Sequence, residues 1–270
     1  MLGKGLPNLG NTCYINSIIQ CLRYSKPFVK SLVNLDVKKS APLTKTLMQV
    51  LYSKTTLEQL RMFVGQLAAA NKDFRLLRQC DAHELYLYVI DKFYEDVPKE
   101  YKNPFLGKLS STLQFPCGHT SETAYPFISI SVELCNRSIQ ECVSSFFSAE
   151  SLTNVSCYEC KKHYTAEKQL ACANFPLILV IHLKRFVSAS LKKTDDVDLE
   201  DEIQIQGRKY FLYAVSNHIG QINSGHYTAH CKRRDGTFYL FNDSSVSSQD
   251  LPERSNLPYI LFYQRHLVEI

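Results

Sequence analysis

The chain of 270 residues lacks the features that mark membrane and secreted proteins. Its longest apolar run, residues 176–183, is about eight residues long, whereas a membrane-spanning helix needs roughly twenty. Residues 1–8 contain no apolar signal core, and the chain shows no internal repeat and no low-complexity linker. We therefore expect a folded globular protein that is neither inserted in a membrane nor secreted.

Tryptophan is absent, and so is a strong excess of charge of one sign. The chain has 31 Lys and Arg against 26 Asp and Glu, and its basic pairs are scattered along the sequence. This pattern indicates a solvated, mildly basic surface and does not favour a nucleic-acid partner. The ten cysteines, in a chain long enough to bury a core, are expected to be reduced thiols of an intracellular protein of the cytoplasm, the nucleus or both.

Helical signals fill the first hundred residues. Apolar residues recur at helical spacing directly after Cys13 and stop before Pro27. Thr55 and Asp81 are each followed three residues later by Glu, the spacing of a capping box, which predicts two more helix starts.

Beyond about residue 109 the pattern changes to short β-rich runs, which we expect at residues 127–134, 177–183, 210–215, 227–231, 238–241 and 259–263. We interpret the acidic segment 195–202 as a solvated loop. Helices followed by strands favour an α+β fold.

Cys13 has two readings at this stage. A cysteine in the first turn of a helix lies among unpaired amide donors and the positive end of the helix dipole, and both favour a reactive thiolate. Free cysteine is also among the most buried residue types, so a packed thiol is the alternative. The nucleophile reading requires a partner base.

His226 opens one β-run, and Asn242 ends the next, with the turn signal Asp235-Gly236 between them. An antiparallel hairpin would bring the two residues to the same end of the ladder, where the amide could orient the imidazole. A strict two-residue turn would place Ser245 opposite His226, so contact with Asn242 requires a bulge, a longer loop or a diagonal reach.

At this point the sequence resembles the ubiquitin-specific proteases, papain-like cysteine hydrolases that remove ubiquitin. Residues 5–17 (Gly-Leu-Pro-Asn-Leu-Gly-Asn-Thr-Cys-Tyr-Ile-Asn-Ser) are similar to the family's Cys box, and residues 210–246 are similar to its His box. Gln-Cys-Asp-Ala-His-Glu at residues 79–84 and His-Leu-Lys-Arg-Phe at residues 182–186 match two further family motifs in the family's order.

The resemblance implies one catalytic domain over residues 1–270, with a helical thumb at about 1–100, a β-rich palm at about 101–270, and fingers near 109–127 and 153–171. It implies that Cys13 is the nucleophile, His226 the general base and Asn242 the residue that orients the ring. Asp243 is the alternative or supporting orienter. Asn8 matches the oxyanion-stabilising Asn of the family.

The resemblance also assigns Asp81, Glu84, Gly225 and Tyr227 to the site of the ubiquitin tail. For Asp81 two compatible roles stay open, a helix cap and a partner for arginines of the tail. Catalysis needs no cofactor.

Family members commonly carry two Cys-x-x-Cys knuckles that bind a structural zinc. Here Cys157 and Cys160 form one pair, but Gln114 stands where the leading Cys of the other would be. Cys117 remains, with His119 as a candidate fourth ligand. Either the fingers bind zinc through these four residues or they have lost the metal and hold together by packing.

Three functions follow. The first is a deubiquitinating thiol protease that cleaves the isopeptide bond after the terminal glycine of ubiquitin, with ubiquitin or ubiquitinated proteins as partners and no nucleic acid or membrane. The second is a protease for another ubiquitin-like modifier. The third is an adaptor that binds ubiquitin without cleaving it. The sequence names no regulatory partner.

Overall fold

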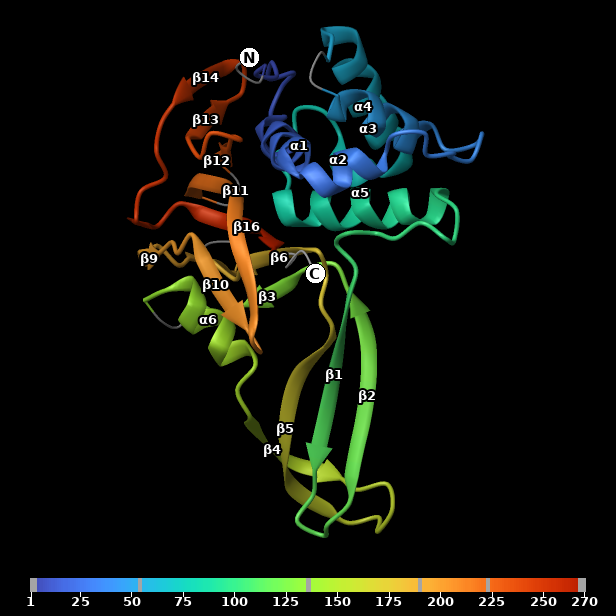
Figure 1. The fold of residues 1–270 in the computed structure, drawn as a ribbon, viewed down its shortest axis with the longest axis vertical. Coiled ribbons are helices and arrows are strands. Elements are labelled where there is room, and N and C mark those ends of the chain that lie inside the picture. Colours follow the sequence, from blue (N-terminus) through green and yellow to red (C-terminus); the bar gives the residue numbers. More distant parts are fainter. Residues whose placement is uncertain (1–3, 53–54, 135–136, 189–190, 222–223, 267–270) are drawn as a thin grey trace.

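The computed structural model describes residues 4–52, 55–134, 137–188, 191–221 and 224–266. The start of the segment that we searched for a signal core, residues 1–3, lies outside these ranges, as does Cys135, one of the ten cysteines. Helices occupy one side of the main body, strands the other, and a long narrow sheet projects away from both (Figure 1). This arrangement confirms the predicted α+β class.

The first hundred residues are helical, as predicted. They form α1 (Cys13–Tyr24), α2 (Lys26–Ser31), α3 (Pro42–Leu51), α4 (Leu57–Ala70), the short 3-10 helix η1 (Lys72–Phe74) and α5 (Ala82–Asp96). Pro27 follows the end of α1 and lies in the first turn of α2, where its missing N–H costs nothing. The cap of α4 is Thr56, which forms a capping box with Gln59, so the predicted box at Thr55 is wrong by one residue.

The main sheet has its central strands buried on both faces. Its order is β14-β13-β12-β11-β16-β6-β3, with β10 paired to β11, and only β3 and β6 run parallel. The strands are β3 (Ile130–Val132), β6 (Ile178–Leu183), β10 (Glu202–Ile205), β11 (Arg208–Gln221), β12 (Ser224–Lys232), β13 (Phe238–Asn242), β14 (Ser245–Ser248) and β16 (Pro258–Arg265).

Alternation along β6 shows how this sheet holds two cores together. Ile178 and Val180 face the core shared with the helices, whereas Leu179 and Ile181 face a second core under the helix α6 (Ile139–Phe146). A strand buried on both faces reads as a continuous apolar run, which is why residues 176–183 form the longest one in the sequence. Within the described residues no helix is long and apolar enough to cross a membrane.

A second sheet forms the projection in Figure 1. Its antiparallel strands have the order β2-β1-β5-β4 and are β1 (Gly107–Gln114), β2 (Thr120–Phe127), β4 (Glu150–Ser156) and β5 (His163–Asn174). The two ranges expected for fingers, 109–127 and 153–171, overlap these four strands and the turns between them. A small third core at the tip gathers around Phe115, Cys157 and Ala166.

The acidic segment 195–202 is not simply a solvated loop, so that expectation is wrong. Val197 is fully buried in the second core, and β9 (Val197–Asp198) pairs with β15 (Arg254–Ser255). The Glu200 carboxylate accepts hydrogen bonds from the first backbone N–H groups of α6 at 3.1 and 3.4 Å. Two-stranded β7 (Phe186–Ser188) and β8 (Leu191–Lys192) complete the fold. The described cysteines are free thiols.

Candidate active site

Cys13 is the first residue of α1, as the sequence predicts. The loop before it is shaped by Asn8, whose side-chain oxygen accepts hydrogen bonds from the backbone N–H groups of Gly10 at 3.0 Å and Thr12 at 3.1 Å. Gly10 has a φ of +106°, a conformation that favours glycine. The local sequence therefore fixes the entry of the chain into α1, and with it the position of the thiol.

The thiol of Cys13 is only 3% exposed, and burial raises its pKa. The backbone N–H of Tyr227 opposes this shift, whereas the negative charge of Asp243 adds to it. The backbone N–H groups of Cys13 and Tyr14 at the helix start lower the pKa, as expected, but the loss of solvent outweighs them. Cys13 needs a base to take its proton.

His226 lies on β12, one residue before Tyr227, and its Nε2 is 2.7 Å from Oδ1 of Asn242 on β13. An amide oxygen only accepts hydrogen bonds, so Nε2 carries the proton and Nδ1 is left free to act as a base. No hydrogen bond joins the Cys13 Sγ to His226 among the described residues. Such bonds are often long before substrate binds, and Tyr227 places the thiol beside the strand that carries His226.

The hairpin between β12 and β13 explains how His226 reaches Asn242. Arg233 and Thr237 close a three-residue loop in which Gly236 has a φ of +88°. Lys232 pairs with Phe238, and extending this register places Ser244, not Asn242, opposite His226. The contact between His226 and Asn242 is therefore diagonal. Of the three alternatives, the hairpin has both the longer loop and the diagonal contact.

The Asp243 carboxylate is held by two amides and makes no hydrogen bond to His226 among the described residues. Asn8 Nδ2 donates to one oxygen at 3.0 Å, and Asn16 Nδ2 donates to the other at 2.7 Å. Leu6 donates its backbone N–H to the Asp243 carbonyl, and Gly5 lies so close that a Cβ there would be 2.6 Å from the same oxygen. In this geometry Asn242 is the residue bonded to the His226 ring, and Asp243 joins the N-terminal segment to the turn after β13.

Asp81 caps α5, which confirms one of its two readings. Its Oδ1 accepts from the backbone N–H groups of His83 at 2.6 Å and Glu84 at 3.1 Å. Its Oδ2 accepts a hydrogen bond from the Tyr259 hydroxyl. Both oxygens are thus engaged, and they face a cavity of about 500 Å³ between α5 and the palm.

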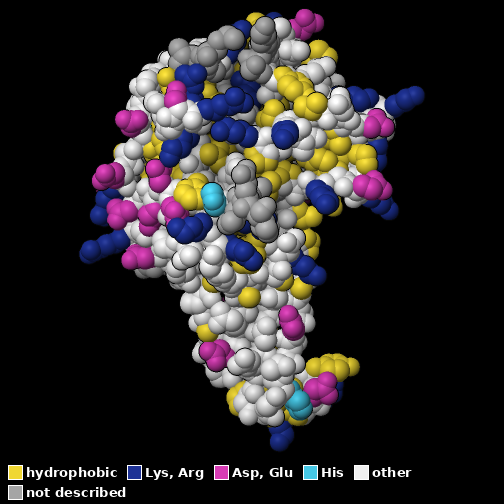
Figure 2. All heavy atoms as spheres, viewed as in Figure 1, with side chains coloured by type: hydrophobic (Ala, Val, Ile, Leu, Met, Phe, Trp, Pro, Cys, Tyr) yellow, Lys and Arg dark blue, Asp and Glu magenta, His cyan; other side chains and the backbone are white. Residues whose placement is uncertain are grey.

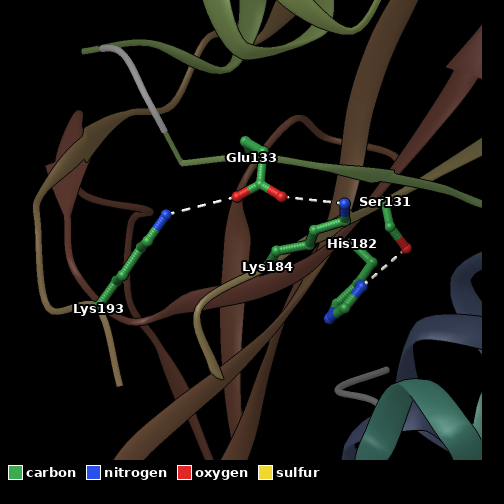
Figure 3. Close-up of polar contacts among 5 residues, drawn as sticks. All are labelled: Ser131, Glu133, His182, Lys184 and Lys193. Atoms are coloured by element: carbon green, nitrogen blue, oxygen red, sulfur yellow. Dashed lines mark hydrogen bonds and ion pairs between the residues drawn. The ribbon is translucent and has the colours of Figure 1, made fainter. Parts of the chain in front are cut away.

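Two kinds of carboxylate line this cavity. Glu133 lies between Lys184 at 3.0 Å and Lys193 at 3.4 Å (Figure 3), and the hydrogen bond from Lys184 lowers the pKa of its carboxyl. Glu84 has no ion-pair partner within the ranges described, and burial together with the charge of Asp81 raises its pKa. The α5 side of the cavity therefore carries negative charge that no lysine neutralises.

Gly225 and Tyr227 are less open than the resemblance implies. Gln79 donates its side-chain amide to the Gly225 carbonyl at 2.6 Å and accepts from the Gly225 N–H at 2.9 Å. Tyr227 is 6% exposed and packs against His218, with ring centroids 4.6 Å apart. A peptide that pairs with the backbone of Gly225 must therefore displace Gln79.

Sequence reasoning assigned no role to Gln79, Asn16, Glu133 or Tyr259. Gln79 and Asn16 stand inside the quoted motifs, and Asn16 offers a usable signal. It is a polar residue at i+3 from Cys13 in a helix that is mostly apolar between Cys13 and Leu22, so a buried partner was to be expected. Glu133 and Tyr259 give no such signal, because their roles arise from the pairing of strands distant in sequence.

The cysteines of the projecting sheet gather at its tip. One ligand atom from each of Cys117, His119, Cys157 and Cys160 lies within 4.8 Å of the others. The neighbouring distances are 3.5 Å from His119 Nδ1 to two sulfurs and 3.6 and 3.8 Å between sulfurs. A tetrahedral zinc with bonds of about 2.3 Å to sulfur has edges of about 3.7 Å, so the cluster fits this ion. Gln114 ends β1 and is not part of the cluster.

Comparisons with known proteins place the chain in a family. The family model described as ubiquitin carboxyl-terminal hydrolase matches residues 4–263. Ubiquitin carboxyl-terminal hydrolase 23 of Arabidopsis thaliana is 29% identical over 98% of this chain and 36% of its own length. Ubiquitin carboxyl-terminal hydrolase 8 of Saccharomyces cerevisiae is 29% identical over 96% of this chain and 70% of its own length.

Solved structures are similar too. A SAGA DUB module containing Ubp8, bound to monoubiquitin, has a TM-score of 0.86 and 28% identity over 98% of this chain and 70% of that one. The Ubp8/Sgf11/Sus1/Sgf73 module bound to ubiquitin aldehyde has a TM-score of 0.84. This chain spans only about a third to a half of the first curated relatives. The family match over nearly the whole chain and the shared fold show that the chain belongs to the ubiquitin carboxyl-terminal hydrolases of the ubiquitin-specific protease type.

Proposed function

We propose that the chain is a deubiquitinating thiol protease that hydrolyses the isopeptide bond after the C-terminal glycine of ubiquitin. The observation that carries this proposal is the 2.7 Å contact between His226 Nε2 and Asn242, on the strand beside the buried thiol of Cys13. This contact leaves His226 Nδ1 available as the base that a thiol of raised pKa requires.

The reaction follows from these groups. His226 Nδ1 takes the proton of Cys13, and the sulfur attacks the carbonyl carbon of the terminal glycine. The oxyanion lies by the Cys13 backbone N–H and the second amide hydrogen of Asn8, whose first is bonded to Asp243. His226 then gives its proton to the departing lysine amine, leaving a thioester on Cys13. A water molecule, deprotonated by His226, releases the glycine carboxylate and restores the thiol.

The charge of the neighbouring cavity supports ubiquitin as the substrate. Asp81 and Glu84 face it without a cation partner in the described residues, so a substrate tail that carries arginines would form charge-assisted hydrogen bonds there. Ubiquitin bound to the similar Ubp8 modules supports the same reading.

Intact-mass analysis with ubiquitin that carries a thiol-reactive C-terminal electrophile tests the proposal. We expect one added ubiquitin on the native chain and none on Cys13→Ala. Cys80→Ala is the matched control, because Cys80 is a half-buried thiol near the cavity and should leave the adduct unchanged. If the folded chain forms adducts only with another ubiquitin-like modifier, that modifier replaces ubiquitin as the substrate. Ubiquitin binding with no adduct and no turnover would favour an adaptor.

We also propose that Cys117, His119, Cys157 and Cys160 bind a structural zinc ion. The ion would join the β1–β2 turn to the β4–β5 turn and supply no step of catalysis. The support is the fit of the distances to a tetrahedral site. Metal analysis of the purified chain should give one zinc per molecule, and His119→Ala with Cys160→Ser should lose it. If the purified chain contains no zinc and the tip of the projecting sheet melts at the same temperature in the native chain and in the double variant, the tip is held together by packing alone.

A further inference from the structure

A basic groove lies at the end of α1, along α2 and beside the β12–β13 hairpin. It encloses about 940 Å³, and of its fourteen lining residues seven are Lys or Arg and one is Asp. Figure 2 shows Lys and Arg side chains gathered over the upper half of this face, with hydrophobic side chains between them. The formal charge of the whole chain is only +5, whereas in this groove seven Lys and Arg stand against one Asp.

Few of these cations are neutralised. Lys232 pairs with Asp201 at 3.1 Å. Arg23 donates to the carbonyl of Val50 at 2.8 Å and to the hydroxyl of Thr55 at 2.7 Å, which holds its guanidinium in place without cancelling its charge. Of the remaining cations, four have no carboxylate within ion-pair distance among the described residues: Lys4, Lys26, Lys30 and Arg234. A groove with this charge attracts an acidic ligand.

Apolar side chains are mixed with these charges. Lys26, Val29 and Lys30 lie on α2, and Val33 lies in the turn directly after it, so charged and apolar side chains follow one another along this segment. Val33 is 59% exposed, and Tyr52, directly after α3, is 44% exposed. Phosphate groups would use the cations alone, whereas an acidic peptide with apolar side chains would use both kinds of side chain.

The groove is separate from the active site, although the same elements carry both. Cys13 begins α1 and Arg23 lies ten residues further, about 15 Å along the helix axis. His226 lies near the start of β12 and Lys232 at its end, about 20 Å away. A ligand in the groove therefore leaves the catalytic cleft open.

We propose that this groove binds an acidic segment of a partner protein in which Asp and Glu are interspersed with apolar side chains. The acidic groups would contact Lys26, Lys30 and Arg234, and the apolar groups would pack on Val33 and Tyr52. Charge complementarity and the mixed lining together select this class of ligand over a nucleic acid.

The test is fluorescence anisotropy on the native chain with a fluorescein-labelled twelve-residue peptide in which Glu alternates with Leu and Phe. We expect saturable binding that weakens with added salt. Lys26→Glu with Lys30→Glu should weaken it on the order of tenfold, since two exposed charge pairs are lost and reversed. The matched control is Lys108→Glu with Lys162→Glu, which makes the same change of charge on the projecting sheet, away from the groove.

Val33→Ser separates the peptide from a polyanion. This substitution should weaken binding of the peptide and leave binding of single-stranded DNA of equal charge unchanged. Two results would overturn the proposal: equal losses in the groove and control variants, or DNA binding as tight as the peptide and equally indifferent to Val33. Circular dichroism of each variant ensures that the compared chains are folded.

Discussion

Asn16 and Asp243 are 227 residues apart in sequence and are joined by a hydrogen bond of 2.7 Å between the Asn16 amide and the Asp243 carboxylate. The bond connects the helix that begins with Cys13 to the turn that follows Asn242. The carboxylate is thereby held by amides rather than by a cation, so its charge still acts on the thiol and raises the pKa of Cys13. Asp243 therefore acts on the charge state of the Cys13 thiol and makes no hydrogen bond to His226 among the described residues.

Asp243→Asn should therefore lower the pKa of Cys13. The substitution removes a negative charge that disfavours the thiolate and keeps an oxygen that accepts from one of the two amides. We expect the alkylation of Cys13 by iodoacetamide, followed by mass spectrometry of its peptide, to reach half its maximal rate at a lower pH. Asp250→Asn, on the exposed segment after β14, is the control. An unchanged or higher midpoint would contradict the assignment.

Asn8→Ala should reduce kcat about 10²- to 10³-fold, the usual loss for one oxyanion donor, with a much smaller change in KM. Asn8 also supports the loop before Cys13, so the variant should melt at a lower temperature as well. Kinetics on a ubiquitin amide substrate, measured well below the melting point, separate the two effects. A loss of kcat no larger than the loss of folded protein would assign Asn8 to the loop alone.

The parts of the site predicted from sequence are those governed by short-range rules. Periodicity placed Cys13 at the start of a helix, and turn signals placed His226 and Asn242 at one end of a hairpin. Continuous apolar runs predicted the buried strands β6 and β16, because a strand that packs on both faces has apolar residues at successive positions in the sequence.

The features that the sequence did not predict depend on interactions between distant segments. The pKa of Cys13 is raised by burial and affected by Tyr227, more than 200 residues away, which no local pattern reveals. The helix α6 lies among strands, and its first turn is completed by Glu200, from a segment that composition alone marks as solvated. His119, a candidate ligand from the sequence, lies within the cluster because two turns of the projecting sheet meet.

Gln79→Ala should lower kcat/KM about tenfold. Gln79 makes two hydrogen bonds to the backbone of Gly225, each worth about 0.5–1.5 kcal/mol, and these fix the residue that precedes His226. Steady-state cleavage of a ubiquitin substrate measures the effect. Gln249→Ala, an exposed glutamine near β14, should behave as the native chain does. A gain in kcat/KM would instead mean that Gln79 chiefly bars the substrate tail.

Acid should destabilise the fold through two stacked histidines. His83 and His182 have ring centroids 3.9 Å apart and are bonded to Ser129 and Ser131 (Figure 3 shows the second pair). Burial lowers the pKa of His83 to about 4 and that of His182 to about 3. The unfolded chain, with ordinary values near 6.5, binds more protons between these limits. The contribution of these two histidines to the free energy of unfolding is therefore complete above pH 6.5 and is lost as the pH falls toward 3.

His182→Gln should therefore reduce the slope of melting temperature against pH between 6.5 and 4. A residual slope is expected, because burial also lowers the pKa of His218 and His230 to about 4. Thermal unfolding in matched buffers gives both curves, and His163→Gln on the projecting sheet is the control, since that side chain is exposed. The comparison uses the slope rather than the melting temperature at one pH, because loss of the stacked ring shifts every point. A slope unchanged from that of the native chain would mean that the pKa of His182 is the same in the folded and unfolded chains, and would contradict the prediction.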